Sequence, residues 1–126
     1  MKAVITADAP APVGPYSQAV AQGKLLFVSG QVPLDPKTGS LIEGDIEAQT
    51  ERVIANLQAI LEAAGTSLAR VVRTTVYVTD LALFGRINAV YARFFCGDPA
   101  PARATVQVAA LPLGAAVEID AIAALD

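Results

Sequence analysis

The sequence predicts an α+β fold, a mixed β-sheet with two helices packed on one face, in a single domain over residues 1–126. Two segments have apolar residues at helical spacing, and each follows a residue that can cap a helix. The other apolar segments are short, rich in β-branched residues and separated by Gly and Pro turns. The resulting order, β-β-β-α-β-α-β-β, is typical of a sheet that carries both helices on one side.

Three strands are expected before the first helix. Residues 2–5 form a short strand, which a Pro- and Gly-rich loop follows. Residues 17–21 and 25–29 form a hairpin across Gln22-Gly23-Lys24. Residues 30–44 are rich in turn residues and are expected to form a loop.

Helices are expected over residues 46–64 and 81–95. Asp45 is the N-cap of the first, and Gly65 fits the C′ position at its end. The N-cap of the second helix is one of two residues, Thr79 or Asp80.

Three further strands are expected, over residues 71–79, 103–110 and 116–124. The last two are joined by a short turn, residues 111–114, and are therefore predicted to pair as an antiparallel hairpin. Side chains alternate between the faces of a strand, and the more apolar set is assigned to the helix side. That set is Val72, Thr74, Val76, Val78, Ala104, Val106, Val108, Ala110, Val117, Ile119, Ala121 and Ala123. The opposite face collects Arg73, Thr75, Tyr77, Arg103, Thr105, Gln107, Glu118 and Asp120, and we expect it to meet other subunits.

Composition limits the classes of function. Hydrophobic residues make up 54% of the chain and charged residues 17%, which suggests that another subunit buries part of the apolar surface. The net charge of −3 and the lack of a basic run argue against a nucleic-acid partner. No apolar run approaches the ~18–20 residues of a membrane span. A single cysteine fits a reducing compartment, so a cytoplasmic protein with no membrane partner is expected.

Histidine is absent, which removes the ordinary forms of Ser-His-Asp and Cys-His catalysis and the commonest zinc sites. No loop gathers the Asp and Glu residues that a magnesium or calcium site would need. An oxygen-ligand site stays possible in principle, but the sequence indicates no metal site.

Arg103 is the main candidate for ligand binding. It stands at the head of an apolar strand and is the only basic residue after Pro99. A buried guanidinium needs an anionic partner, and its planar fork fits a carboxylate. Glu118, on the neighbouring segment, is a candidate partner. The pair is either a plain cross-strand salt bridge or a site in which Arg103 grips a substrate carboxylate and Glu118 holds water.

Four other residues could line a pocket. Ser29 and Gly30 end a strand, although turn statistics favour an ordinary exit into a turn there. Tyr16 could close a pocket with its ring, or simply pack as an amphipathic residue. Asn88 lies mid-helix, and Asn is a poor helix former. It either lines a pocket or is an ordinary side chain that faces solvent.

The sequence contains six motifs, and these residues lie in five of them. The six motifs are Gly14-Pro15-Tyr16-Ser17-Gln18-Ala19, Phe27-Val28-Ser29-Gly30-Gln31-Val32-Pro33, Pro36-Lys37-Thr38-Gly39, Asn88-Ala89-Val90-Tyr91, Pro101-Ala102-Arg103-Ala104-Thr105-Val106-Gln107-Val108 and Val117-Glu118-Ile119-Asp120-Ala121-Ile122-Ala123. In this order, and over nearly all of the chain, the motifs resemble the Rid family of reactive imine and enamine deaminases.

The resemblance implies a chorismate-mutase-like fold, a homotrimer with sites at subunit interfaces, and no cofactor. It implies hydrolysis of 2-iminobutanoate and 2-iminopropanoate to 2-keto acids and ammonia. In the family, the arginine that matches Arg103 binds the substrate carboxylate, and the glutamate that matches Glu118 positions the hydrolytic water. The residues that match Tyr16, Ser29, Gly30 and Asn88 line the site.

Thr105 stands where some family members carry Cys, so a catalytic role for a thiol at this position is not general in the family. Whether Thr105 contributes to the site through its side chain or only through its backbone N–H stays open. A non-catalytic trimer that binds keto acids for regulation, or acts like a chaperone, is the alternative function. Intact Glu118 favours the enzyme.

Overall fold

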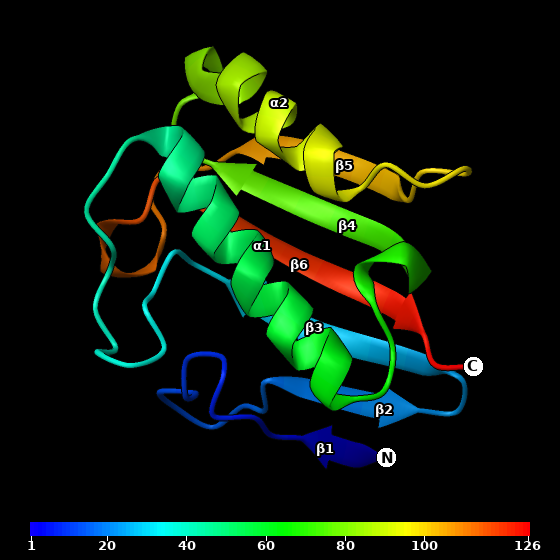
Figure 1. Cartoon of the computed structure of the whole chain (residues 1–126). Coiled ribbons are helices and arrows are strands. Elements are labelled where there is room, and N and C mark those ends of the chain that lie inside the picture. Colours follow the sequence, from blue (N-terminus) through cyan, green and yellow to red (C-terminus); the bar gives the residue numbers. More distant parts are fainter.

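The computed structural model describes residues 1–126 and has one six-stranded sheet of order β1-β2-β3-β6-β4-β5, with both helices on the same face (Figure 1). This confirms the predicted α+β class. The strands are β1 (Lys2–Val4), β2 (Ala19–Gln22), β3 (Leu25–Gln31), β4 (Val71–Val78), β5 (Ala102–Gln107) and β6 (Val117–Ala124). The helices are α1 (Ile46–Ala63) and α2 (Phe84–Phe94), with short 3₁₀ turns η1 (Leu68–Arg70), η2 (Leu81–Leu83) and η3 (Pro112–Gly114).

The predicted hairpin of the last two strands is wrong. β6 lies between β3 and β4 and is antiparallel to both, whereas β5 pairs with β4 in parallel at the sheet edge. The chain leaves β4, passes through α2 and returns as β5, and a crossover of this kind sets two strands parallel. The segment between β5 and β6 then carries the chain past β4 before β6 begins (Figure 1).

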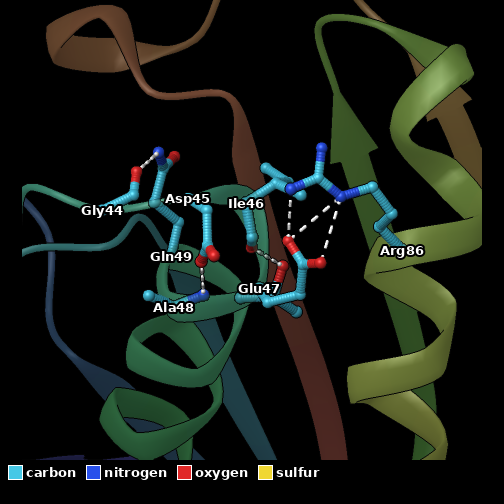
Figure 2. Close-up of polar contacts among 8 residues, drawn as sticks. Gly44, Asp45, Ile46, Glu47, Ala48, Gln49 and Arg86 are labelled. Atoms are coloured by element: carbon cyan, nitrogen blue, oxygen red, sulfur yellow. Dashed lines mark hydrogen bonds and ion pairs between the residues drawn. The ribbon is translucent and has the colours of Figure 1, made fainter.

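Helix α1 begins at the predicted residue and ends one residue earlier than predicted, with Ala64 as its C-cap. Asp45 accepts a hydrogen bond from the Ala48 N–H at 2.9 Å, and Figure 2 shows this cap beside the Gln49 amide, which donates to the Gly44 carbonyl. At the other end Gly65 has φ +83, and the N–H of Thr66 donates to the Leu61 carbonyl. This is the Schellman arrangement, in which a glycine at C′ avoids the steric cost of the left-handed conformation.

Two ion pairs link the helices on their outer sides. Arg86 of α2 reaches Glu47 of α1 at 2.6 Å with both carboxylate oxygens as acceptors (Figure 2), and Arg93 reaches Glu51 at 2.7 Å. The hydrogen bond from Arg86 lowers the pKa of the Glu47 carboxyl. All four side chains are substantially exposed, so these pairs orient α2 against α1 more than they stabilise the fold.

The apolar stripe of α1 packs on β3 and β6, with Val53, Ile54, Leu57, Ile60 and Leu61 fully buried. On β6, the predicted inward set is confirmed, because Val117, Ile119, Ala121 and Ala123 are all buried.

The prediction for the other two strands is partly wrong. Thr74, Val76 and Val78 of β4 are buried as expected, but Val72 is 47% exposed. A register shift between Val71 and Arg73 turns it outward and buries Val71 in its place.

On β5 the whole assignment is reversed. Arg103 contacts α2, and Gln107 accepts from the Leu81 N–H of η2, so these residues lie on the helix side and Val106 lies on the open face. Edge strands have less cover, so the more apolar set need not be the inner one.

The second helical segment begins as predicted at Asp80, whose carboxylate accepts from the Ala82 N–H at 2.9 Å. It forms the turn η2 before α2 starts at Phe84. None of the helices has the length and apolar character that crossing a membrane requires.

Candidate functional site

Gln18 fixes the loop that follows β1. Its side chain is 2% exposed. Its Oε1 accepts from the Thr6 N–H at 2.8 Å, and its Nε2 donates to the carbonyls of Thr6, Ala9 and Pro10 at 2.9–3.3 Å. A buried amide with every polar atom paired costs little and holds the backbone around it in one arrangement. The loop therefore has a defined position over the ends of β2 and β3.

Ser29 ties this loop to β3. Its Oγ donates to the Ser17 carbonyl at 2.6 Å, and its N–H donates to the Gln18 carbonyl at 2.9 Å. The Ser29 proton is thus used within the chain, although its oxygen can still accept. Tyr16, directly before Ser17 in the chain, is half exposed, and its hydroxyl accepts from the Val13 N–H at 3.3 Å.

Asn56 of α1 holds the facing loop. It is fully buried, and its amide donates to the carbonyls of Val32 and Leu34 at 3.3 and 3.0 Å. Between the two loops lies a cavity of about 480 Å³, lined by residues of 10–18, 29–34 and 112–113 and by Glu118. Tyr16, Ser29, Gly30 and Glu118, four of the predicted site residues, all line this cavity.

Gly30 and Glu118 lie in direct contact. A Cβ built on Gly30 would overlap the Glu118 carboxylate, at 2.9 Å from Cδ and 3.2 Å from Cγ. Only glycine therefore leaves room for the carboxylate in this position. The contact occurs where the β3–β6 register shifts, between Val28 and Gln31, so the irregular ladder opens the space that Glu118 occupies.

Glu118 is half-buried, with no cation within salt-bridge distance. Burial, with a smaller contribution from the negative charge of Asp120, raises the pKa of its carboxyl. Asp120 itself accepts from the Tyr77 hydroxyl at 3.1 Å and the Thr75 N–H at 3.2 Å. A carboxylate with a raised pKa in a cavity is a candidate for proton transfer.

Arg103 lies elsewhere, on the helix face of the edge strand. Its Nη1 donates to Asn88 Oδ1 at 2.7 Å, and its Cζ is 4.8 Å from the Tyr91 ring centroid and 5.3 Å from that of Phe84. The side chain is exposed and has no acidic partner. The expectation that it enters the sheet as a buried charge is wrong, because β5 is the last strand and leaves its outer side open.

Thr105 lies on the same side of β5 as Arg103. Its Oγ1 is buried and has no hydrogen-bond partner. The Val108 N–H donates to the Val78 carbonyl at 2.8 Å, so the main chain of Val108 faces β4. In a parallel ladder every second residue points its N–H and C=O toward the partner strand. The main-chain groups of Arg103 and Thr105 therefore face the free edge of the sheet. The Thr105 N–H is therefore available to an outside acceptor.

Within one chain, then, the candidate residues form two groups. Glu118 and Arg103 lie on opposite faces of the sheet, and β4 separates their strands. They form no salt bridge, so the first of the two interpretations of this pair, a cross-strand salt bridge, is wrong. The first group offers a carboxylate without a cation, and the second offers a cation without a carboxylate.

Sequence reasoning missed the residues that support these groups. Gln18 and Asn56 are buried amides among mostly apolar residues. A polar residue inside an apolar pattern is the sequence feature that could have identified both. Tyr91 belongs to the same motif as Asn88 but was given no role, and only the fold shows Arg103 over its ring. No group of three or more His, Cys, Asp or Glu residues comes together in a way that could hold a metal ion.

Comparisons with known proteins cover nearly the whole chain. The family model described as Endoribonuclease L-PSP matches residues 6–125. Protein DfrA of Myxococcus xanthus is 56% identical over 97% of this chain and 94% of its own length. The chloroplastic Reactive Intermediate Deaminase A of Arabidopsis thaliana is 48% identical over 97% of this chain and 65% of its own length. The crystal structure of E. coli TdcF with bound serine is 41% identical, covers 100% of both chains and superposes with a TM-score of 0.93.

Proposed function

Because the chain belongs to the Rid family, whose model is described as Endoribonuclease L-PSP, we propose that it hydrolyses 2-imino acids such as 2-iminobutanoate and 2-iminopropanoate. In this reaction water adds to the C=N carbon and the C–N bond then breaks. The products are the 2-keto acid and ammonia, and no electrons are exchanged. A relative that is named as a reactive intermediate deaminase supports this choice of reaction.

The separation of Arg103 from Glu118 carries the proposal for assembly. Each group lies open to solvent or to a cavity and lacks the charge that the other supplies. We propose that a homotrimer completes the site, with Arg103 of one subunit facing the Glu118 cavity of its neighbour. A cyclic trimer repeats one such contact three times and so makes three equal sites.

In this site Arg103 anchors the substrate carboxylate. Asn88 occupies one nitrogen of the guanidinium, and the remaining N–H groups are free for a bidentate contact. The free Thr105 N–H at the sheet edge supplies a further donor. Charged hydrogen bonds of this kind contribute roughly 1.5–3 kcal/mol each.

Glu118 holds the hydrolytic water and transfers protons. Burial favours its neutral form, and a nearby guanidinium favours the ionised form. When the substrate carboxylate neutralises Arg103, Glu118 becomes more basic and can take a proton from the attacking water. Its negative charge also stabilises a protonated imine, whose carbon is the more electrophilic.

A small anion fits the protein's charge better than RNA does. The net charge is −3, and phosphate backbones are bound through clusters of Lys and Arg. The description of the family model as an endoribonuclease therefore does not decide the substrate of this chain.

A competition assay tests the proposed activity. Threonine dehydratase generates 2-iminobutanoate in the presence of semicarbazide, and semicarbazone formation is followed by absorbance. The wild type should suppress trapping, whereas Arg103→Ala and Glu118→Gln should not. Arg103→Ala should lose about 2–5 kcal/mol of carboxylate binding. Arg70→Ala removes an exposed arginine that pairs with Asp126 at 3.7 Å, and as the matched control it should retain activity.

Mixing the two inactive variants tests the assembly. If one site takes Arg103 and Glu118 from different subunits, refolding Arg103→Ala with Glu118→Gln in equal amounts restores about a quarter of the sites. No recovery would place both residues of a site in one subunit. Failure of the wild type to suppress trapping, together with binding of 2-oxobutanoate, would instead favour the non-catalytic keto-acid-binding trimer.

A further inference from the structure

We propose that Tyr91, held at its hydroxyl by Thr74, is the positioning residue that fixes the guanidinium of Arg103 for carboxylate binding. The proposal rests on the function proposed above and adds residues to which no role has been given. Tyr91 does not touch the substrate in this scheme. It acts through Arg103, whose Cζ lies 4.8 Å from the ring centroid.

Helix α2 provides a surface for the guanidinium. Phe84, Asn88 and Tyr91 follow one another at helical spacing and so lie on one side of the helix. Phe84 contributes a second ring at 5.3 Å from Cζ, and the Asn88 carbonyl oxygen accepts from Nη1 at 2.7 Å. Two rings and one hydrogen bond restrict both the tilt and the rotation of the planar group, which a carboxylate must meet edge on.

Tyr91 is itself held firmly. It is 6% exposed, its ring stacks on Phe95 with centroids 4.3 Å apart, and its hydroxyl lies 2.7 Å from Thr74 Oγ1. Thr74 is fully buried in β4, which pairs with a neighbouring strand on each side. Arg103 is therefore held against the rigid core, through Tyr91 and Thr74, and its position does not depend on a loop.

All the groups that hold Arg103 are neutral. Asn88 and Phe84 carry no charge, and burial raises the pKa of the Tyr91 phenol, so it stays protonated at neutral pH. An acidic partner would position the guanidinium equally well but would compete with the substrate for it. Aromatic rings and an amide orient the cation and leave its whole charge for an incoming anion.

Four variants separate ring, hydroxyl and general packing. Tyr91→Leu removes the ring, Tyr91→Phe removes only the hydroxyl, and Thr74→Val removes the partner of that hydroxyl. Phe94→Leu is the matched control, because Phe94 lies 5.3 Å from the Arg93 guanidinium in a pair of the same kind away from Arg103.

The binding readout compares 2-oxobutanoate with 2-oxobutanamide, which has the same shape but no charge. Tyr91→Leu should weaken 2-oxobutanoate binding about fivefold to tenfold, the range of a partly desolvated cation–π pair. Binding of the amide should change little, and KM for the imine should rise with kcat nearly unchanged. Tyr91→Phe and Thr74→Val should show the same pattern at about twofold to threefold, and Phe94→Leu should keep the wild-type ratio.

The side-chain Nε–H signal of Arg103 in a ¹H–¹⁵N spectrum, identified by its loss in Arg103→Lys, reports the geometry without any ligand. Ring currents should shift it upfield in the wild type and in Tyr91→Phe, and the shift should become clearly smaller in Tyr91→Leu, where only the Phe84 ring remains. An unchanged signal in Tyr91→Leu would overturn the proposal even in a fully active enzyme. Equal weakening of acid and amide binding would also overturn it, because that pattern indicates general damage to packing. If the wild type neither binds 2-oxobutanoate nor suppresses trapping, the proposed function fails while the spectrum still decides the role of Tyr91.

Discussion

Substitution of Gly30 by alanine should move Glu118 and cost activity far more than stability. The backbone of Gly30 is outside the left-handed region, so alanine meets no conformational penalty there. The whole effect comes from the added methyl group, which would overlap the carboxylate and lie 2.9 Å from Cδ. Real Cβ atoms do not approach heavy atoms this closely, so the Glu118 side chain must leave its rotamer.

The size of each effect follows from this contact. A side chain forced about 30° off its rotamer costs roughly 0.5–1.5 kcal/mol, and overpacking costs about 1–3 kcal/mol where nothing yields. Glu118 is half-buried and can move into the cavity, so we expect the lower part of this range, about 1 kcal/mol, and a fall in Tm of about 4 °C. A catalytic group displaced by about 1 Å loses on the order of 100-fold in rate.

The assay is kcat/KM for 2-iminobutanoate, measured with the melting temperature in two backgrounds. In the wild-type background Gly30→Ala should lower both quantities. In a Glu118→Ala background the clash is gone, so adding Gly30→Ala should leave the melting temperature unchanged. Gly85→Ala is the matched control, because a Cβ at Gly85 meets nothing within 4 Å, and in helix α2 it should raise stability by about 0.5–1 kcal/mol.

Two results would refute this reasoning. One is a Gly30→Ala enzyme with wild-type kcat/KM, which would mean that the position of Glu118 does not matter to the reaction. The other is a stability loss that persists in the Glu118→Ala background, which would place the effect of the methyl group on some other neighbour.

Two further predictions concern the same cavity. Burial and, to a smaller extent, the negative charge of Asp120 raise the pKa of Glu118, so Asp120→Asn should make Glu118 easier to ionise. Since the ionised form of Glu118 holds the water, the acid limb of the kcat/KM profile should move to lower pH. Asp126→Asn, at the C-terminus, should leave the limb in place. A limb that moves to higher pH would contradict the role given to ionised Glu118. Leu113 is 68% exposed with φ +62, so Leu113→Gly should relieve backbone strain and raise the free energy of unfolding by about 1 kcal/mol in a urea titration. A lower midpoint in urea would show that packing of the leucine outweighs its strain.

The local elements were predictable because their signals are local. Asp45 and Gly65 mark the ends of α1 through hydrogen bonds that reach only three to five residues along the chain. The alternation along β6 is equally local, since a strand buried on one face needs an apolar residue at every second position. For Tyr16, Ser29 and Gly30, which line the cavity, the local pattern left an ordinary structural role open, and the resemblance of their motifs to the Rid family pointed to them.

The relation between Arg103 and Glu118 was not predictable from these signals. A short turn between two strands favours a hairpin, and only the pairing of the whole sheet shows β6 inserted between β3 and β4. Sheet order depends on which strands bury the most surface together, and that sum involves residues far apart in sequence.

The sequence by itself therefore determined the class of fold, the approximate position of both helices and the residue types that could bind a small anion. The tertiary structure decided which face each of those residues occupies. It placed Arg103 over Tyr91 at an open sheet edge, and Glu118 against Gly30 in a cavity on the other side of β4. The physical reason is that a side chain's period along a strand is fixed by the backbone, whereas its neighbours across the sheet are fixed by the packing of the entire core.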